Sequence, residues 1–229
     1  MFDGKFRAPI DKAVKPIGNG LRRTGLTPDH LTIIGLLVAA GAAVAIGYGK
    51  LYLGLVLVIL AALPDLLDGA LAKASNTSSQ RGAFFDSVVD RVTDALLLGG
   101  VGWYLALRET PQLSLLPFAV MALSSVISYQ RAKAESLGLY AKGGLMERAE
   151  RIIALCLGLL FNRLLIPILW IMLVLTLITC IQRFVTVWKQ AAVAPATAAR
   201  IELRRARRQE IRVKITKRRT RVPRRQRKT

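Results

Sequence analysis

Apolar residues gather in six long stretches of the chain, separated by short polar segments. A helix needs roughly 20 apolar residues to cross a bilayer, and most of the stretches approach or exceed that length. The fifth stretch is shorter and follows a polar lead near Met146 that we expect to be helical. The stretches run at about 31–48, 51–72, 84–107, 113–134, 149–163 and 165–188. The pattern predicts an all-α, polytopic membrane protein with six transmembrane helices.

The first 22 residues follow a different pattern. Apolar side chains recur there at spacings of three or four, at Phe2, Phe6, Ile10, Val14 and Ile17. That spacing places them on one face of a helix. We therefore expect residues 1–22 to form an amphipathic helix on the membrane surface, followed by a six-helix domain at residues 23–190.

Composition and charge divide the chain into an apolar body and a basic tail. The chain has 229 residues, 53% of them hydrophobic, and a net charge of +20. Residues 189–229 hold 16 of the 34 Lys and Arg but only two carboxylates. Because the body keeps nearly all the apolar residues, it is neither a disordered chain nor a water-soluble domain.

The remaining basic residues predict the topology. If the N-terminus is cytoplasmic, residues 1–30 and the loops at 73–82 and 131–151 are cytoplasmic too, and these hold most of the body's Lys and Arg. This asymmetry predicts a multi-pass protein with both termini in the cytoplasm. We expect the tail, residues 191–229, to be disordered and to bind anionic lipids. It has no aromatic residue on which a base could stack, so we expect no nucleic-acid partner.

Cysteine and histidine residues are few. Cys156 and Cys180 lie in apolar runs, where small buried side chains are expected, so neither a zinc site nor a disulfide framework is predicted. His30 is the only histidine. Catalysis must therefore depend on carboxylates, on Lys or Arg, or on metal.

Five aspartates fall within 30 residues at the junction of the second and third stretches. Asp65 and Asp68 are spaced i, i+3 near the end of the second stretch. Asp86, Asp90 and Asp94 are spaced i, i+4, i+8 at the start of the third. Each set therefore lies along one helical face. The connecting segment is short, so the two helices are antiparallel neighbours and the acidic faces can meet.

Carboxylates brought together at a membrane edge repel each other unless cations neutralise them. Hard oxygen ligands favour Mg²⁺, Mn²⁺ or Ca²⁺ over zinc or copper. A divalent metal site is the interpretation we favour. Two others stay open: helix-end carboxylates paired with Arg81 or Arg91, and a pathway for protons or ions.

The spacing of these residues matches a known motif. From Asp65 the chain reads D-L-L-D-G-A-L-A-K, then eight residues, then G-A-F-F-D-S-V-V-D. This resembles the CDP-alcohol phosphotransferase signature D-x2-D-G-x2-A-R-x8-G-x3-D-x3-D. One position differs, because Lys73 replaces the usual arginine and loses its planar fork. Asp94 falls outside the signature, where a supporting role and a simple polar contact are both open.

The resemblance implies the chemistry of a site. It implies two divalent ions, Mg²⁺ or Mn²⁺, that grip the pyrophosphate of a CDP-lipid. Asp90 would also be the general base that takes the proton of the attacking hydroxyl while CMP leaves. The implied metal ligands are Asp65, Asp68, Asp86 and Asp90.

A second set of polar residues lies near the cytoplasmic ends of the last three stretches. Together these cations would form a cradle for the phosphate of an acceptor alcohol. Individually, the loop cations also suit positive-inside anchoring, and Arg183 also suits a snorkelling or ion-paired side chain. The main candidates are Arg131, Arg151 and Arg183, and the weaker ones are Ser128, Lys133 and Arg148.

Residues 12–188 resemble the actinobacterial phosphatidylinositol phosphate synthases, through L-R-R-T-G-L-T-P-D-H-L-T, V-I-S-Y-Q-R-A-K-A-E, G-G-L-M-E-R-A-E-R and I-T-C-I-Q-R. The resemblance implies transfer of the phosphatidyl group from CDP-diacylglycerol to 1D-myo-inositol 3-phosphate, by a homodimer in the bacterial inner membrane. The implied residues on the CDP-lipid side are Pro28, Asp29, His30, Leu31, Gly69, Lys73 and Ser79.

Two other functions remain open. Glycerol 3-phosphate as acceptor would need the same anion cradle, so the motif identifies the donor better than the acceptor. A divalent-cation transporter would also use intramembrane carboxylates. Carboxylates at mid-membrane would favour transport, whereas these cluster at one edge beside Gly69 and Gly82.

Overall fold

The computed structural model describes residues 28–75, 80–109, 111–141 and 143–192, and for Pro28 and residues 64–75 it describes the backbone alone. These residues form six α-helices and two short 3-10 helices, without strands. The α-helices are α2 (Pro28–Gly47), α3 (Leu51–Ser75), α4 (Gln80–Arg108), α5 (Leu115–Ser136), α6 (Arg148–Leu160) and α7 (Leu165–Ala191). The 3-10 helices are η1 (Pro111–Ser114) and η2 (Asn162–Leu164). The all-α prediction is confirmed.

Each predicted apolar stretch coincides with one helix, and no helix end differs from the predicted one by more than four residues. We expected a helical lead near Met146, but α6 begins at Arg148 because Glu147 has an extended backbone, with φ −88° and ψ −175°. We expected the stretch to run to 163, but α6 ends at Leu160 and residues 162–164 form η2. The 13 residues of α6 extend only about 20 Å.

Three helices of the described chain are long and apolar enough to cross a membrane: Asp29–Gly47, Pro111–Ser136 and Asn162–Ala191. In α3 the described apolar segment is shorter, at Leu51–Leu63, and is not one of the three. Helix α4 has ample length, with 29 residues, but its first half carries aspartates and arginines. Helix α6 is too short. The structure therefore gives three candidate spans, and the count of six remains a prediction.

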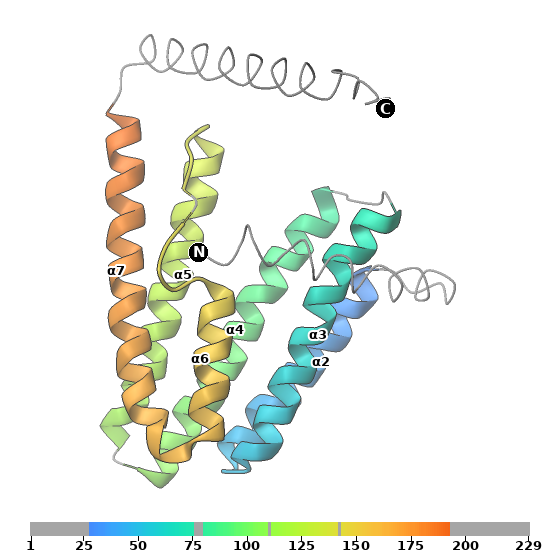
Figure 1. The fold of residues 1–229 in the computed structure, drawn as a ribbon, viewed down its shortest axis with the longest axis vertical. Helices are drawn as coiled ribbons and strands as arrows, with labels where there is room; N and C mark the ends of the chain where they lie inside the picture. Colours follow the sequence, from blue (N-terminus) through green and yellow to red (C-terminus); the bar gives the residue numbers. More distant parts are fainter. Residues whose placement is uncertain (1–27, 76–79, 110, 142, 193–229) are drawn as a thin grey trace, which may run out of the picture. The chain divides into compact units, whose positions relative to one another are not determined.

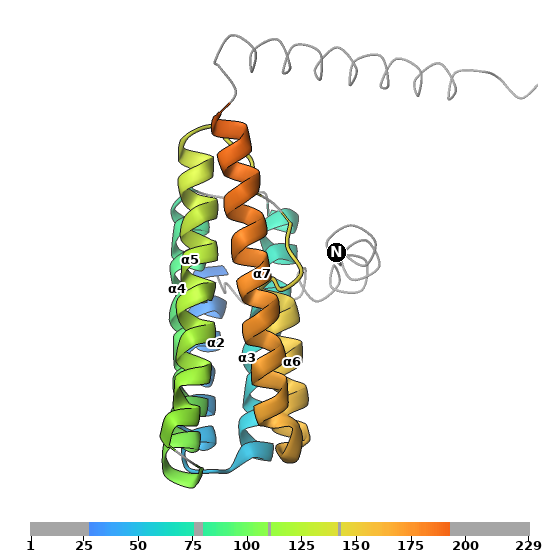
Figure 2. The ribbon, with the colours of Figure 1, turned by 90° about the vertical axis from the view of Figure 1, so that its left-hand side faces the viewer.

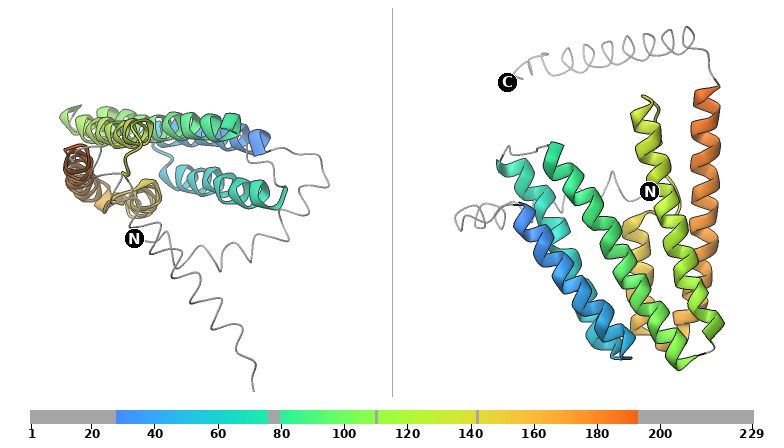
Figure 3. Two further views of the ribbon diagram at one scale, coloured as in Figure 1. Left: turned by 90° about the horizontal axis from the view of Figure 1, so that it is seen from above. Right: turned by 180° about the vertical axis from the view of Figure 1, so that it is seen from behind.

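The helices of residues 28–184 lie in two rows. Helices α5, α4 and α2 form one row, and α7, α6 and α3 form the other (Figures 2 and 3). Helix α2 packs against both α3 and α4, α4 also packs against α5, and α3 packs against α6. The chain divides into two units at Phe184, and of the second unit the structure describes residues 185–192.

Small residues let the helices of the core approach closely. The core holds Ala39, Ala42 and Ile46 of α2 together with Val101 and Leu105 of α4. A Cβ at Gly100 would lie 2.5 Å from the carbonyl oxygen of Ala43, which is closer than real side chains come. The absence of a side chain at Gly100 therefore sets the separation of α2 and α4, and with it the position of the polar first half of α4.

The fold places the ends that carry the predicted site together. Helix α3 ends, and α4 begins, at the end of the bundle where α5 also ends (Figure 1). The predicted surface helix at residues 1–22, Ser79 and all but the first two residues of the predicted tail lie outside the described residues.

Candidate active site

The predicted metal ligands come from the facing ends of α3 and α4. Asp65 and Asp68 lie on the last turns of α3. Asp86 and Asp90 lie one turn apart near the start of α4, and both are half-buried. Carboxylates at this spacing share a helix face, so both can reach one ion. The oxygen donors and their partial burial fit a hard divalent cation.

Asp90 has arginine partners in this structure. Its Oδ1 lies 2.7 Å from NH1 of Arg148, and its Oδ2 lies 3.5 Å from NH2 of Arg91. The pairing with Arg91 is one of the alternatives that the sequence left open. Among the residues whose side chains are described, no three carboxylate, Cys or His groups lie close enough to hold a metal. Asp65 and Asp68 are outside that set.

One turn further along α4, Asp94 pairs with the start of α6. NH2 of Arg151 donates a hydrogen bond of 2.6 Å to Oδ2 of Asp94, and both side chains are buried. Nε of Arg148 lies 3.7 Å from Oδ1 of the same carboxylate. We call these four residues, Asp90, Asp94, Arg148 and Arg151, the ion-pair ladder. The polar contact foreseen as one role of Asp94 is therefore present.

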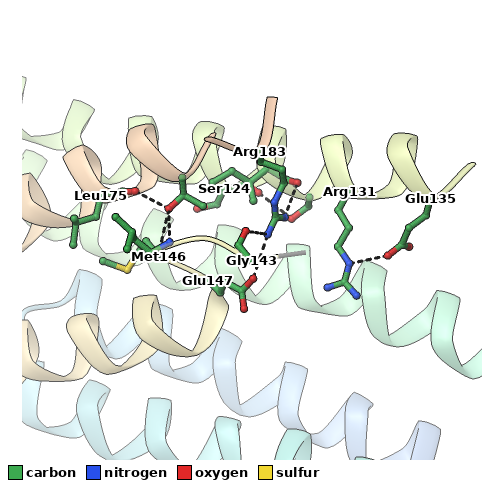
Figure 4. Close-up of polar contacts among 12 residues, drawn as sticks. Ser124, Arg131, Glu135, Gly143, Met146, Glu147, Leu175 and Arg183 are labelled. Atoms are coloured by element: carbon green, nitrogen blue, oxygen red, sulfur yellow. Dashed lines mark hydrogen bonds and ion pairs between the residues drawn. The ribbon is translucent and has the colours of Figure 1, made fainter. Parts of the chain in front are cut away.

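Arg183, from α7, is buried and surrounded by oxygen acceptors (Figure 4). Its NH1 donates to the carbonyl of Ile127 at 3.2 Å, and its NH2 donates to the carbonyl of Gly143 at 3.1 Å. NH2 also pairs with Oε1 of Glu147 at 3.2 Å. Within the described residues Nε is buried without a hydrogen-bond partner. A buried guanidinium needs such acceptors, and here one donor is left over.

A second residue of α7, Thr179, also contacts the loop of residues 143–147 that Arg183 contacts. Oγ1 of Thr179 accepts hydrogen bonds from the backbone N–H groups of Leu145, at 3.1 Å, and Met146, at 3.0 Å. The loop turns at Gly143, whose φ of +96° suits glycine. We call Thr179 and Arg183, with their contacts to residues 143–147, the loop clamp. The sequence reasoning missed Thr179 and Glu147, although a polar residue in an apolar stretch was the available signal for Thr179.

Other predicted acceptor residues differ in their surroundings. Arg131 is exposed, and its Nε pairs with Oε1 of Glu135 at 3.0 Å, within α5 (Figure 4). Arg131, Arg151 and Arg183 come from three different helices, α5, α6 and α7. Ser128 donates to the carbonyl of Ser124 in its own helix, and Lys133 is exposed.

The predicted CDP-lipid residues lie on α2 and α3. At the start of α2, Leu31 is buried, Asp29 is half-buried and His30 is exposed. Gly69 and Lys73 lie on the last turns of α3, which ends at Ser75. The start of α2 and the end of α3 lie at the same end of the bundle as the start of α4 (Figure 1).

Comparison with known families agrees with this arrangement. The model of the CDP-alcohol phosphatidyltransferase family matches residues 25–188, which include every helix described here except the last three residues of α7. The chain belongs to this family. Its match spans the aspartates of α3 and α4 and the arginines of α5, α6 and α7.

Individual relatives and solved structures show which members of the family this chain resembles. The chain is 37% identical over 192 residues to phosphatidylinositol phosphate synthase of Mycobacterium marinum, covering 80% of this chain and 82% of the relative. It is 37% identical to the enzyme of that name from Streptomyces avermitilis, covering 87% of each. The fold matches the Mycobacterium tuberculosis phosphatidylinositol phosphate synthase with CDP-DAG bound, with a TM-score of 0.72 and 35% identity over 77% of this chain and 94% of that one. The same enzyme has a structure with manganese and citrate.

Proposed function

We propose that the chain is a phosphatidylinositol phosphate synthase, which transfers the phosphatidyl group of CDP-diacylglycerol to 1D-myo-inositol 3-phosphate and releases CMP. The observation that carries the proposal is the junction of Asp90 with Arg148, at 2.7 Å, where the acidic face of α4 meets the basic start of α6. Carboxylates would hold the metal that the CDP-lipid donor requires, and cations would bind the phosphate of a phosphorylated acceptor. The two relatives described above carry the name phosphatidylinositol phosphate synthase, which supports the proposal.

The donor side would lie over α3 and α4. A divalent pair, Mg²⁺ or Mn²⁺, would supply charge neutralisation of the pyrophosphate and stabilise CMP as leaving group. The manganese complex of the Mycobacterium tuberculosis enzyme supports metal use. The start of α2 and the end of α3 would receive the nucleotide through Asp29, His30, Gly69 and Lys73. The residues that would hold the metal are Asp65, Asp68, Asp86 and Asp90.

Asp90 would take the proton of the attacking hydroxyl. Its half-buried carboxylate lies where the α4 face meets α6, so an alcohol bound by the α6 arginine could present its hydroxyl there. Arg148, whose NH1 lies 2.7 Å from Oδ1, fixes the position of this carboxylate. The hydroxyl oxygen then attacks the phosphorus of the phosphatidyl group as the bond to CMP breaks.

The acceptor phosphate would bind between α5, α6 and α7. Arg131, Arg151 and Arg183 supply the positive charge, and the unpartnered Nε of Arg183 is a donor suited to an oxyanion. Ser128, Lys133 and Arg148 are secondary candidates. Inositol itself lacks the phosphate that these cations would bind, so only the phosphorylated alcohol should be an efficient acceptor.

The setting would be the bacterial inner membrane. We propose six spans with both termini in the cytoplasm, a surface helix at residues 1–22, and a basic tail at 191–229 that binds anionic lipids. We also propose a homodimer. The distribution of Lys and Arg along the chain supports the orientation.

One assay tests the function. Purified protein in detergent is given CDP-diacylglycerol with Mg²⁺ or Mn²⁺, and CMP release is measured with inositol 3-phosphate, glycerol 3-phosphate or free inositol. Release with inositol 3-phosphate alone is the expected result. Preference for glycerol 3-phosphate would overturn the acceptor assignment and keep the donor chemistry. Metal uptake into proteoliposomes without CMP release would favour a transporter instead.

A further inference from the structure

Asp94 is the most buried carboxylate among the residues whose side chains are described, with 8% of its surface exposed. It lies four residues beyond the last aspartate of the motif, on the same face of α4. A charge at such a depth is costly unless it is paired. Asp94 is paired with arginines of α6, so its role follows from those contacts.

The two contacts of Asp94 are unequal. The bond from NH2 of Arg151 is 2.6 Å long and joins two buried groups. The separation from Nε of Arg148 is 3.7 Å, which is beyond a hydrogen bond. Arg148 makes its short contact, 2.7 Å, with Asp90 instead. Asp94 therefore interacts much more strongly with Arg151 than with Arg148.

The geometry of the two helices gives each arginine its own short contact. Asp90 and Asp94 are four residues apart on α4, and Arg148 and Arg151 are three apart on α6. Helices α4 and α6 run in the same direction (Figure 1). The first aspartate thus meets the first arginine, and the second meets the second. Asp90 lies one turn from Asp94 on the same face, so it is the next carboxylate along α4 from the one that Arg151 contacts.

We propose that Asp94 is a positioning residue that holds the guanidinium of Arg151 beside the reaction site and away from Asp90, so that Arg151 can bind the acceptor phosphate. A guanidinium has five donors, so one edge can bind Asp94 while others bind an oxyanion. This inference rests on the proposed function, since it takes the acceptor to be a phosphorylated alcohol.

A double-mutant cycle tests the proposal. The variants are Asp94→Asn, which keeps the size of the side chain, Arg151→Gln, and both together, each assayed for CMP release while acceptor and CDP-diacylglycerol are varied separately. Loss of a charge-assisted bond should raise the KM for the acceptor by about 10- to 100-fold in Asp94→Asn and change the KM for CDP-diacylglycerol little. If Asp94 acts through Arg151, the double variant should have the acceptor KM of Arg151→Gln alone.

Two matched variants separate positioning from general damage. Asp94→Glu keeps the charge and should bring the acceptor KM back toward that of the wild type. Glu109→Gln removes an exposed carboxylate just beyond the other end of α4 and should change neither KM. If Asp94→Asn alone does not fold, Arg151→Gln and the double variant decide the question. The double variant removes both buried charges together, so it is the one expected to fold best.

Two results would overturn the inference: additive effects on the acceptor KM, or an equal rise in both KM values. Failure of the proposed function is distinct, because it would appear as no turnover of inositol 3-phosphate by the wild type. If the wild type prefers glycerol 3-phosphate, the same cycle is run with that acceptor.

Discussion

The ion-pair ladder and the loop clamp both bury arginine, but they stabilise its charge differently. In the ladder, Arg151 meets a buried carboxylate at 2.6 Å. In the clamp, Arg183 meets two backbone carbonyls and Glu147, whose side chain is 33% exposed. A carboxylate cancels a positive charge, whereas carbonyl dipoles only solvate it. The carboxylate of Glu147 is also partly exposed, so water screens its charge more than that of the buried Asp94. Arg183 therefore keeps more of its charge for an incoming anion, whereas Arg151 is held more firmly in place by its buried partner.

The largest effect is expected in the ladder, at Asp90. Asp90→Asn removes the proposed base and should lower kcat for CMP release by about 10²- to 10⁴-fold. The KM for the acceptor should change much less, because the arginines remain. Steady-state kinetics on the purified variant would check this, with Glu109→Gln as the control. A variant with near-normal kcat would remove Asp90 from the chemistry.

In the clamp, Arg183→Lys should raise the KM for the acceptor by about 10- to 100-fold while kcat falls less. Lysine keeps the charge but has one compact head, which cannot reach the Ile127 carbonyl, the Gly143 carbonyl and Glu147 together. Arg163→Lys, at an exposed arginine of η2, is the matched control. An unchanged acceptor KM would show that Arg183 only holds the loop.

Thr179→Val tests the structural half of the clamp. The change keeps the shape but leaves two backbone N–H groups without their acceptor, which should lower the free energy of unfolding by about 1–3 kcal/mol. Thermal denaturation in detergent measures it. Thr176→Val is the control, because its hydroxyl donates to Met172 in its own helix. Equal losses in both variants would contradict a role for Thr179 in fixing the loop.

The smallest effect is expected at the exposed pair of Arg131 and Glu135. Glu135→Gln removes a surface ion pair, which contributes about 0.5 kcal/mol or less. Glu135 would no longer compete with the acceptor phosphate for the guanidinium of Arg131. The acceptor KM should therefore fall, by at most about threefold. Initial-rate measurements at low ionic strength would resolve the change. A large rise in KM would instead place Glu135 in the acceptor site.

Much of the fold was accessible from the amino-acid order. Six apolar stretches became six helices, because length and hydropathy are local properties. The errors were also local: the extended backbone at Glu147 delayed the start of α6, and Leu160 ended it early. The family could be inferred as well, since the aspartate motif is a matter of spacing along two adjacent helices.

The pairing of the charges could not be read in this way. The sequence marked Asp94, Arg151 and Arg183 as notable, but their partners lie 57 and 36 residues away. Which carboxylate an arginine meets depends on how helices are rotated and offset, and packing such as that of Gly100 against Ala43 decides this. The amino-acid sequence therefore determined which segments are helical and where their charged residues fall. Packing between the helices determined which of those charged residues touch.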